Sequence, residues 1–421
     1  MLARTYKNIT YCTCGKALQA LSACVMLMCA SCASDTIVKE IEETDPNGTD
    51  PLKFTCQIQD DVPTTATRAT ALSTGFIVST YKSYAVSDKQ QTVMDRYTVE
   101  YKTSGTAWDG NVRPYWDYTQ VSGQIQRYWD FSNFPYRFHA VAPCPDNKSA
   151  VTLTDTEVKL DKGYSCQTVT DGVVSPSNAV AEPYMLAQVH RAADGADTDI
   201  LAQDDEHRNI NTSSTSLNRE VKMPFHHLNS KVRFAVYCLS PWVTANYLYV
   251  KDLTVKVSSS DFITSASGFN STCTESSSWR PDVSPFGFTG LTKAASSPTL
   301  LRYSGMSNGT PLQDNDLREN QTQKTANFLQ CKDGIMQIPQ DGVKMTVSLK
   351  LLTADKTDYK TLADIPIKLD DNTDVFNWKP GYIYTYYLVI GGIPDKLEIE
   401  FTCTLTPWED ISGSLSTDLE Q

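Results

Sequence analysis

The sequence predicts an all-β protein with two tandem antiparallel β-sandwich domains, which follow a signal peptide and an acidic tether. Short runs of β-branched and aromatic residues recur along the chain, several with apolar and polar residues in alternation. Turn signals rich in Gly, Pro, Asn and Asp separate these runs, and convincing stretches with the 3.6-residue period of a helix are missing. Strands that do not alternate with helices favour sandwiches over a parallel sheet covered by helices.

Residues 1–31 have the three parts of an export signal. Residues 1–16 carry basic residues and no acids, Ala17 to Met28 is almost wholly apolar, and small residues precede Cys32. The apolar run is shorter than the roughly 20 residues that a membrane-spanning helix needs. A cysteine directly after Ala-Ser resembles a bacterial lipobox, whose cysteine is acylated and becomes the first residue of the mature chain. We therefore expect an exported lipoprotein acylated on Cys32; an ordinary signal peptide is the alternative.

The first strand is expected shortly after the signal. Residues 32–51 are acidic and rich in turn residues, which predicts a solvated tether. Residues 52–59 then alternate apolar and polar side chains, and the apolar set is Leu52, Phe54, Cys56 and Ile58. A polar loop over 60–70 follows, with Arg68 as its single basic residue.

The two sandwich domains are expected over residues 52–222 and 223–421. Strand-like runs in the first occupy 76–81, 97–101, 136–141 and 151–154, and those in the second occupy 223–237, 253–257, 343–351, 365–369, 382–390 and 397–405. The polar stretch 191–219 is expected to be a linker or a large loop, and residues 258–327 to hold long loops with a few short strands. Strand 382–390 is expected to present Tyr382, Tyr384 and Tyr386 on its outer face.

Charge and cysteine usage exclude some classes of partner and cofactor. The 421 residues carry a formal net charge of −12, with no cluster of Lys and Arg, so a nucleic-acid partner is not expected. Seven of the twelve cysteines lie beyond Cys32, widely spread and without a CxxC pair, so a zinc site is not expected. Cysteines in strand-like runs, such as Cys56 and Cys403, are interpreted as small core residues, and spacing alone gives no disulfide pairing.

The sequence offers no catalytic constellation. His226 and His227 are adjacent on a strand and point to opposite faces, so they cannot readily bind one metal ion. A Gly-x-Ser-x-Gly elbow and a phosphate-binding glycine loop are both missing. The acids of 194–199 and 204–206 could hold calcium, but their spacing fails the EF-hand pattern and favours a solvated loop. We predict no enzyme activity, no metal and no cofactor.

Three local patterns together resemble a known family. The first is the lipobox-like start, the short strand and then Thr67-Arg68-Ala69; the second is Phe225-His-His-Leu-Asn-Ser-Lys-Val-Arg-Phe; the third is Asn377-Trp-Lys-Pro-Gly-Tyr-Ile-Tyr-Thr-Tyr-Tyr-Leu-Val, followed by a last strand and Pro407-Trp408. As a set they resemble the fimbrillin-like lipoproteins of Bacteroidales, the subunits and accessory proteins of type V pili. The resemblance implies domains of the transthyretin-like sandwich type.

The resemblance also implies a route of assembly. Such precursors travel as lipoproteins to the outer membrane, where a trypsin-like protease cuts after a basic residue in the loop behind the first strand. Here the cut would fall between Arg68 and Ala69. It would remove the segment from Cys32 to Arg68 and with it the strand 52–59, whose Leu52, Phe54, Cys56 and Ile58 plug a groove. A strand from another pilus subunit, identical or different, would then fill the groove, and the polar tail 409–421 is one candidate donor. A member that is never cut would act as a base, cap or regulator.

Two other functions stay open. One is a surface lipoprotein that binds a host or bacterial glycan or protein and takes part in adhesion, with Trp108, Trp116 and Trp129 as stacking surfaces in an unusually aromatic region. The other is a hydrolase on a β-sandwich scaffold, because sequence alone does not exclude two positioned carboxylates.

Overall fold

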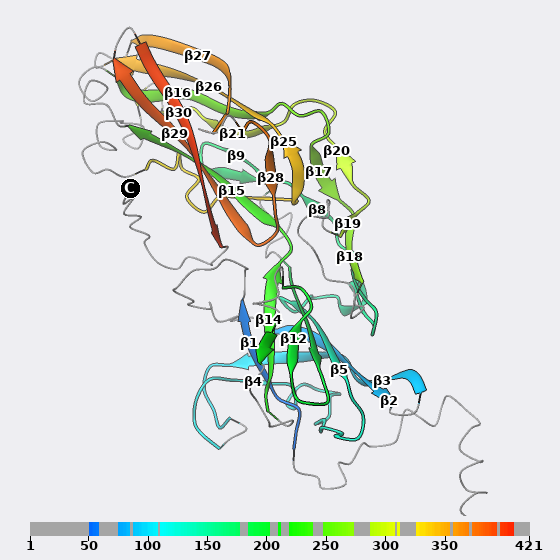
Figure 1. Ribbon diagram of the computed structural model, residues 1–421. Coiled ribbons are helices and arrows are strands. Elements are labelled where there is room, and N and C mark those ends of the chain that lie inside the picture. The colour runs from blue at the N-terminus through cyan, green and yellow to red at the C-terminus, as the bar shows by residue number, and fades with distance from the viewer. Residues whose placement is uncertain are drawn as a thin grey trace, which may run out of the picture. The chain divides into compact units, whose positions relative to one another are not determined.

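The computed structural model of the chain describes the core of the protein but not its first residues. The described residues are 50–58, 75–84, 87–107, 110–176, 184–202, 209–211, 219–238, 247–272, 287–307, 310–311, 326–353, 357–369, 373–393 and 396–407. Their regular structure is β apart from one 3₁₀ turn, η2 (Lys148–Ala150), which confirms the predicted all-β class (Figure 1). Within these ranges no helix is long and apolar enough to cross a membrane.

The N-terminal half builds a nine-stranded sheet. Its strands are, in spatial order, β1 (Phe54–Ile58), β14 (Val221–His227), β11 (Met185–Arg191), β5 (Tyr136–Ala142), β2 (Phe76–Tyr84), β3 (Ser87–Lys102) and β4 (Tyr115–Asp117), and β12 (Asp197–Asp199) and β13 (Asn209–Asn211) branch from β11. The strands expected over 52–59, 76–81 and 136–141 are present, and the one expected over 97–101 is the end of the longer β3.

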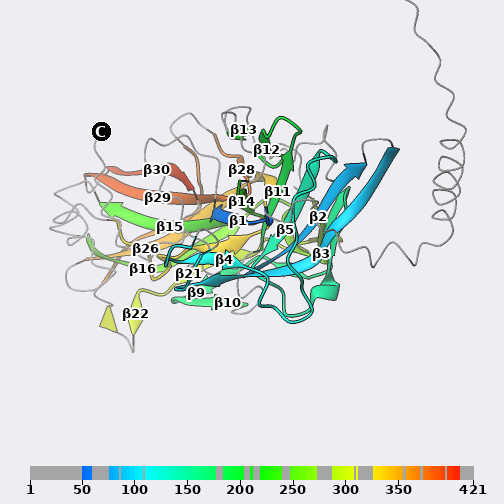
Figure 2. The ribbon, with the colours of Figure 1, turned by 90° about the horizontal axis from the view of Figure 1, so that it is seen from below.

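Two further sheets belong mainly to the C-terminal half. The six-stranded sheet has the order β10 (Val173–Ser175), β9 (Thr168–Thr170), β21 (Thr299–Tyr303), β16 (Tyr247–Val257), β26 (Met345–Thr353) and β27 (Asp358–Pro366). The four-stranded sheet has the order β24 (Ile335–Gln337), β15 (Ser230–Cys238), β29 (Tyr382–Ile393) and β30 (Lys396–Pro407), and its last three strands run side by side in Figure 2.

Short strands complete the described fold. They are β6 (Val151–Leu153), β7 (Glu157–Leu160), β18 (Gly268–Thr272) and β19 (Phe288–Thr289) in one sheet, β8 (Tyr164–Ser165), β17 (Ile263–Ala266) and β20 (Thr292–Lys293) in another, and the pairs β22 (Met306–Ser307) with β23 (Thr310–Pro311) and β25 (Gln340–Val343) with β28 (Phe376–Trp378). The short strands β17 to β23 lie in the region 258–327, where short strands were expected.

The sheets are mixed rather than purely antiparallel. Most neighbouring strands are antiparallel, but β1 with β14, β15 with β29, and β21 with β9 are parallel pairs. Parallel neighbours cannot be joined by a tight hairpin, so each of these pairs brings together segments that are far apart in the sequence.

Alternation along the strands explains the core of the C-terminal half. In β26, Met345, Val347, Leu349 and Leu351 are buried while the residues between them are half-buried. They share one hydrophobic cluster with inward residues of β15 and β29, so the six-stranded and four-stranded sheets enclose a common core. A second cluster collects the inward residues of β1, β14, β11, β5, β2 and β3.

Tyr384 and Tyr386 of β29 face the core, so the expectation of an outer tyrosine face is wrong for these two residues. Tyr384 and Tyr386 are 4% and 2% exposed and belong to the core of the C-terminal half. Tyr386 accepts a hydrogen bond from the indole of Trp378 at 3.0 Å, and Tyr384 accepts one from the backbone N–H of Lys379 at 2.8 Å. These bonds satisfy the hydroxyls and allow the rings to be buried.

Part of the expected linker is also core. In the stretch 191–202, Asp197, Ile200 and Leu201 are at most 4% exposed, and β12 pairs with β11. A linker or large loop is therefore the wrong prediction for these residues. Strand β14 spans the expected domain boundary between 222 and 223 and lies in the nine-stranded sheet; the boundary itself stays a prediction.

Candidate functional site

Strand β1 lies at one end of the nine-stranded sheet. It pairs in parallel with β14, from Phe54 opposite Val221 to Ile58 opposite Phe225, and β14 is its only strand partner in the described part of the chain (Figures 1 and 2). The N–H of Val221 donates to the carbonyl of Lys53 at 2.8 Å. A terminal strand with one neighbour is the arrangement from which a strand can leave without breaking the rest of the sheet.

The residues just before β1 pair with a second segment, Arg127–Trp129. The N–H of Leu52 donates to the carbonyl of Arg127 at 2.8 Å, and the N–H of Trp129 donates to the carbonyl of Asp50 at 3.1 Å. The hydroxyl of Tyr118 donates to the carbonyl of Leu52 at 3.1 Å. Two receiving segments therefore hold the chain from residue 50 to 58: Arg127–Trp129 first and β14 second.

The apolar side chains of this segment fill a pocket. Leu52 is fully buried and Phe54 is 3% exposed. The Phe54 ring makes edge-on contacts with three rings at centroid distances of 6.0 to 6.1 Å; they belong to Phe76, Tyr118 and Phe138. Burial of two such side chains is worth about 1.5–3 kcal/mol each.

The other two predicted plug residues are described less fully. Cys56 is half-buried and packs against the same cluster. The backbone of Ile58 belongs to β1, but its side chain lies outside the described part of the chain. The described side chains that fill the pocket behind β1 are thus Leu52, Phe54 and Cys56.

A buried ionic cluster lies behind the receiving segments. Arg191, at the end of β11, is fully buried and binds Asp197 in a fork, with Nε to Oδ1 at 2.7 Å and Nη2 to Oδ2 at 2.9 Å. Arg219 also reaches Asp197 Oδ2 at 2.8 Å. Nearby, Nε2 of His226 lies 2.8 Å from Oδ2 of the buried Asp199. Burial of these carboxylates is tolerated because each has an ionic or hydrogen-bonding partner.

The sequence prediction missed this cluster. The sequence predicts a solvated loop over 194–199 in preference to a calcium site. Asp197 and Asp199 instead face cationic or imidazole partners from β11, β14 and the residues before β14. The described residues contain no group of three or more His, Cys, Asp or Glu side chains that could hold a metal ion. Alternation in Asp197-Thr-Asp199, which places both acids on one face of a short strand, is the local signal that could have found it.

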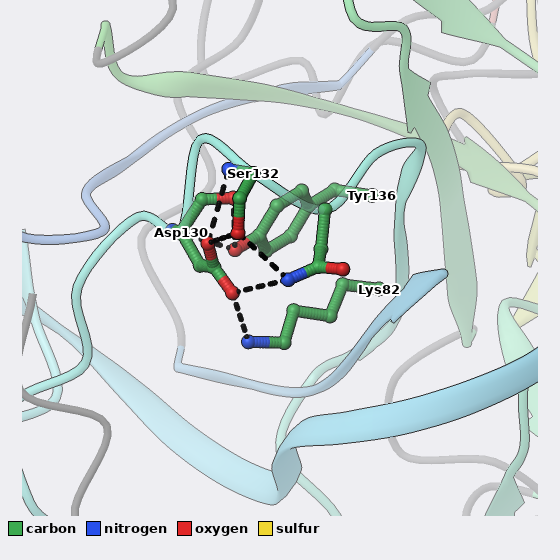
Figure 3. Close-up of polar contacts among 5 residues, drawn as sticks. Lys82, Asp130, Ser132 and Tyr136 are labelled. Carbon is green, nitrogen blue, oxygen red and sulfur yellow. Dashed lines mark hydrogen bonds and ion pairs between the residues drawn. The ribbon is translucent and has the colours of Figure 1, made fainter. Parts of the chain in front are cut away.

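A tight turn follows the segment Arg127–Trp129 (Figure 3). The carboxylate of Asp130 accepts hydrogen bonds from Lys82 Nζ at 2.8 Å, from the Ser132 N–H at 3.0 Å and from Asn133 Nδ2 at 2.7 Å. The Asp130 N–H donates to the hydroxyl of Tyr136 at 2.8 Å. Burial alone would raise the pKa of Asp130, but these hydrogen bonds outweigh it and hold the pKa well below its usual range.

Two of the three predicted stacking tryptophans, Trp116 and Trp129, are described, and both are buried. Trp116 is 7% exposed and Trp129 is 1% exposed, and both belong to the core of the N-terminal half. Trp116 packs on Phe76 and Tyr101, each at 5.2 Å between ring centroids. Neither ring offers an open face to solvent on which a sugar could stack. Trp108 lies outside the described residues, as do Cys32, Arg68 and Ala69.

Comparisons with known proteins give a family match and several similar solved structures. A family model described as "Fimbrillin-like" matches residues 67–408. Among solved structures, a fimbrial protein from Bacteroides vulgatus is 15% identical, with 86% of this chain and 100% of that chain covered and a TM-score of 0.47. Candidate cell adhesion proteins from Bacteroides ovatus and Bacteroides uniformis are 10% and 12% identical, with 85% of this chain and 98% and 99% of those chains covered and TM-scores of 0.40 and 0.36. No curated protein matches. Because the family model spans most of the chain, the protein belongs to the fimbrillin-like family.

Proposed function

We propose that the protein is a structural subunit or accessory protein of a cell-surface fimbrium, with a role in adhesion. It is exported as a lipoprotein anchored in the outer membrane through acylated Cys32, and it assembles by β-strand donation once its N-terminal segment is removed. The observation that carries the proposal is the position of β1: a terminal strand, held by one parallel neighbour, with its apolar side chains in a pocket.

A cut after Arg68 would turn β1 into a separate piece. Every residue of β1 precedes Arg68 in the chain, and the next described strand, β2, begins at Phe76. After the cut only non-covalent contacts would retain the strand: the β14 ladder, the hydrogen bonds to Arg127–Trp129 and the pocket around Phe54. The family match covers residues 67–408, which is most of the part of the chain that such a cut would leave.

Loss of β1 would create a receptor for another strand. The edge of β14 would present unpaired N–H and C=O groups, and the pocket rings Phe76, Tyr118 and Phe138 would lose their cover. An exposed edge beside an apolar pocket is the arrangement that binds an extended strand, since backbone hydrogen bonds give affinity and alternate side chains give specificity.

A strand with the required pattern occurs elsewhere in this chain. The sequence Lys53-Phe-Thr-Cys-Gln-Ile58, which is β1 and the residue before it, matches Glu400-Phe-Thr-Cys-Thr-Leu405 of β30. Phe-Thr-Cys is identical in the two, and each ends in an apolar residue. Ile399 of β30 corresponds to Leu52. Strand β30 is the last described strand and lies at the edge of its sheet, so a second copy of the chain could donate it once β30 leaves β29 and Phe401 leaves its own core. This pattern makes β30 a better candidate donor than the polar tail 409–421.

Limited trypsin digestion of the purified precursor tests the proposal. We expect the wild type to form a ladder of SDS-resistant oligomers after a cut at Arg68, and Arg68→Gln to form none. Arg302→Gln, which removes an exposed arginine from β21, is the matched control and should polymerise like the wild type. Cleavage at Arg68 that yields only monomers would contradict the proposal.

The state of the protein on the cell separates its two structural roles. A mass spectrum of surface-extracted protein should show a mature N-terminus at Ala69 for an assembled subunit, or an acylated Cys32 for an anchored base, cap or regulator. The glycan-binding alternative gains no support from Trp116 and Trp129, because both rings are buried.

A further inference from the structure

Arg191 reaches both segments that receive the strand. Besides its fork to Asp197, its Nη1 donates to the carbonyl of Arg219 at 2.9 Å and its Nη2 donates to the carbonyl of Glu220 at 3.2 Å. Glu220 directly precedes Val221, the residue that donates to Lys53. One side of the guanidinium is thus attached to the start of β14.

The other side of Arg191 contacts the second receiving segment. Its guanidinium carbon lies 4.6 Å from the centroid of the Trp129 ring, within the range of a cation–π contact. The backbone N–H of Trp129 is the donor to Asp50. Arg191 therefore contacts Trp129, which binds Asp50, and Glu220, which directly precedes the residue that binds Lys53.

The chemistry of the Arg191 guanidinium suits a role in holding two chain segments at a fixed distance. An arginine fork is planar and rigid, so a bidentate contact to Asp197 fixes its orientation as well as its position. A buried ion pair is weak evidence for a gain in stability, because well-packed apolar residues of similar volume would often serve as well. The contacts of Arg191 instead fix the separation of two chain segments that no strand pairing joins directly in the described ladder.

We propose that Arg191 is a positioning residue of the strand-binding groove. It holds the segment Arg127–Trp129 and the start of β14 at the separation that an incoming strand requires, and it does so from residues that stay in the chain after a cut at Arg68. The groove would then persist while it is empty, ready for a strand from a second copy. This inference rests on the proposed function.

Arg233 provides a matched control for a buried arginine. It is 5% exposed on β15, in the four-stranded sheet. Its Nε donates to Thr385 Oγ1 at 2.6 Å, and its guanidinium carbon lies 5.0 Å from the Phe328 ring centroid. Loss of the Arg233 guanidinium therefore perturbs a buried arginine with hydrogen-bond and cation–π contacts that lies away from the receiving segments.

The experiment compares wild type, Arg191→Lys and Arg233→Lys as full-length precursors. Each is cut with trypsin under limiting conditions, the protease is inhibited, the released fragment is removed, and a fluorescent peptide of residues 50–59 is titrated by anisotropy. We expect Arg191→Lys to weaken peptide binding at least about tenfold, which equals about 1.4 kcal/mol, the size of one charge-assisted hydrogen bond. Arg233→Lys should bind the peptide within about twofold of the wild type. Thermal melting of the uncut precursors is the accompanying measurement, and we expect similar melting temperatures for the two variants.

The possible failures are distinguishable. If the wild type binds the peptide and the two variants bind it equally well, Arg191 has no positioning role. If the cut wild type neither releases its strand nor binds the peptide, the proposed function itself fails. Should Arg191→Lys not fold, Asp197→Asn takes its place, because it removes the carboxylate that orients the fork, and the same comparison with Arg233→Lys decides the outcome.

Discussion

Replacement of Phe54 by Ala should loosen the N-terminal strand once the chain is cut. The Phe54 side chain is 3% exposed and lies among three aromatic rings, so its truncation leaves a cavity as well as losing apolar burial. Phe→Ala substitutions in a core cost about 3–5 kcal/mol. The lower value suits a site at the end of a sheet, where neighbours can relax into the space.

A loss of about 3 kcal/mol corresponds to a dissociation constant roughly a hundredfold higher, since each 1.4 kcal/mol is tenfold. Most of this change should appear as faster dissociation, because related complexes differ mainly in their off-rates. The assay labels the N-terminal fragment of the precursor, cuts at Arg68 under limiting trypsin, and follows release of the label by size-exclusion chromatography.

Thr55→Ala is the matched control. Thr55 is the next residue of β1, is half-buried, and points to the opposite face of the strand, so its truncation leaves the pocket intact. Release from Thr55→Ala should stay close to the wild-type rate. An off-rate for Phe54→Ala within about fivefold of the control would refute the argument that the aromatic pocket retains the strand.

Three further predictions concern the N-terminal half. Burial and the neighbouring His190 lower the pKa of His139 from 6.5 to about 3, so the unfolded state binds more protons below pH 6.5 and stability is lost as the pH falls toward 3. In urea denaturation, the free energy of unfolding should fall between pH 7 and pH 5 by about 2 kcal/mol less in His139→Gln than in the wild type. Asp130→Asn should destabilise the protein by about 1–3 kcal/mol at pH 7. The difference from the wild type should shrink as the pH falls below 4, because the carboxyl is then protonated in the unfolded state while its lowered pKa keeps it ionised in the folded state. Trp116→Ala should lower the melting temperature through a loss of about 3–5 kcal/mol, and a glycan array that binds the wild type but not a folded Trp116→Ala would contradict its assignment to the core.

Local alternation predicted which side chains of the first strand segment are buried. The apolar positions 52, 54 and 56 were expected on one face, and Leu52 and Phe54 are indeed the buried side chains of the segment. This succeeded because a strand with one polar face carries its register in its own sequence. The partner of the strand did not follow from that pattern, since a parallel neighbour such as β14 lies more than 160 residues away.

The tyrosines of β29 show where alternation stops being informative. It indicates which residues share a face, and Tyr384 and Tyr386 do share one, but it does not tell which face is covered. Here the covering residues come from another sheet, and two hydrogen bonds from Trp378 and Lys379 satisfy the hydroxyls. A tyrosine has an apolar ring and a polar hydroxyl, so its burial depends on whether the surrounding structure offers the hydroxyl a partner.

Strand β11 and its ionic cluster were missed for the same physical reason. Gln188, His190 and Arg191 break the apolar pattern of a buried strand, although all seven residues of β11 are buried. Arg191 can be buried because Asp197 lies opposite it in the hairpin with β12. The partner that neutralises a buried charge is brought into place by the tertiary fold, and the preferences of single residues do not reveal it.

The parallel pairing of β1 with β14 also has a consequence for symmetry. A strand that replaces β1 in the same direction must enter with a fixed polarity, and the groove that receives it and the edge strand β30 that resembles it are different surfaces of one chain. Contacts between unlike surfaces do not pair up into a closed twofold dimer; they repeat, and without closure they generate an open filament. Such a filament has two chemically different ends, an empty groove at one and an unplaced donor at the other, so growth and termination would need different partners.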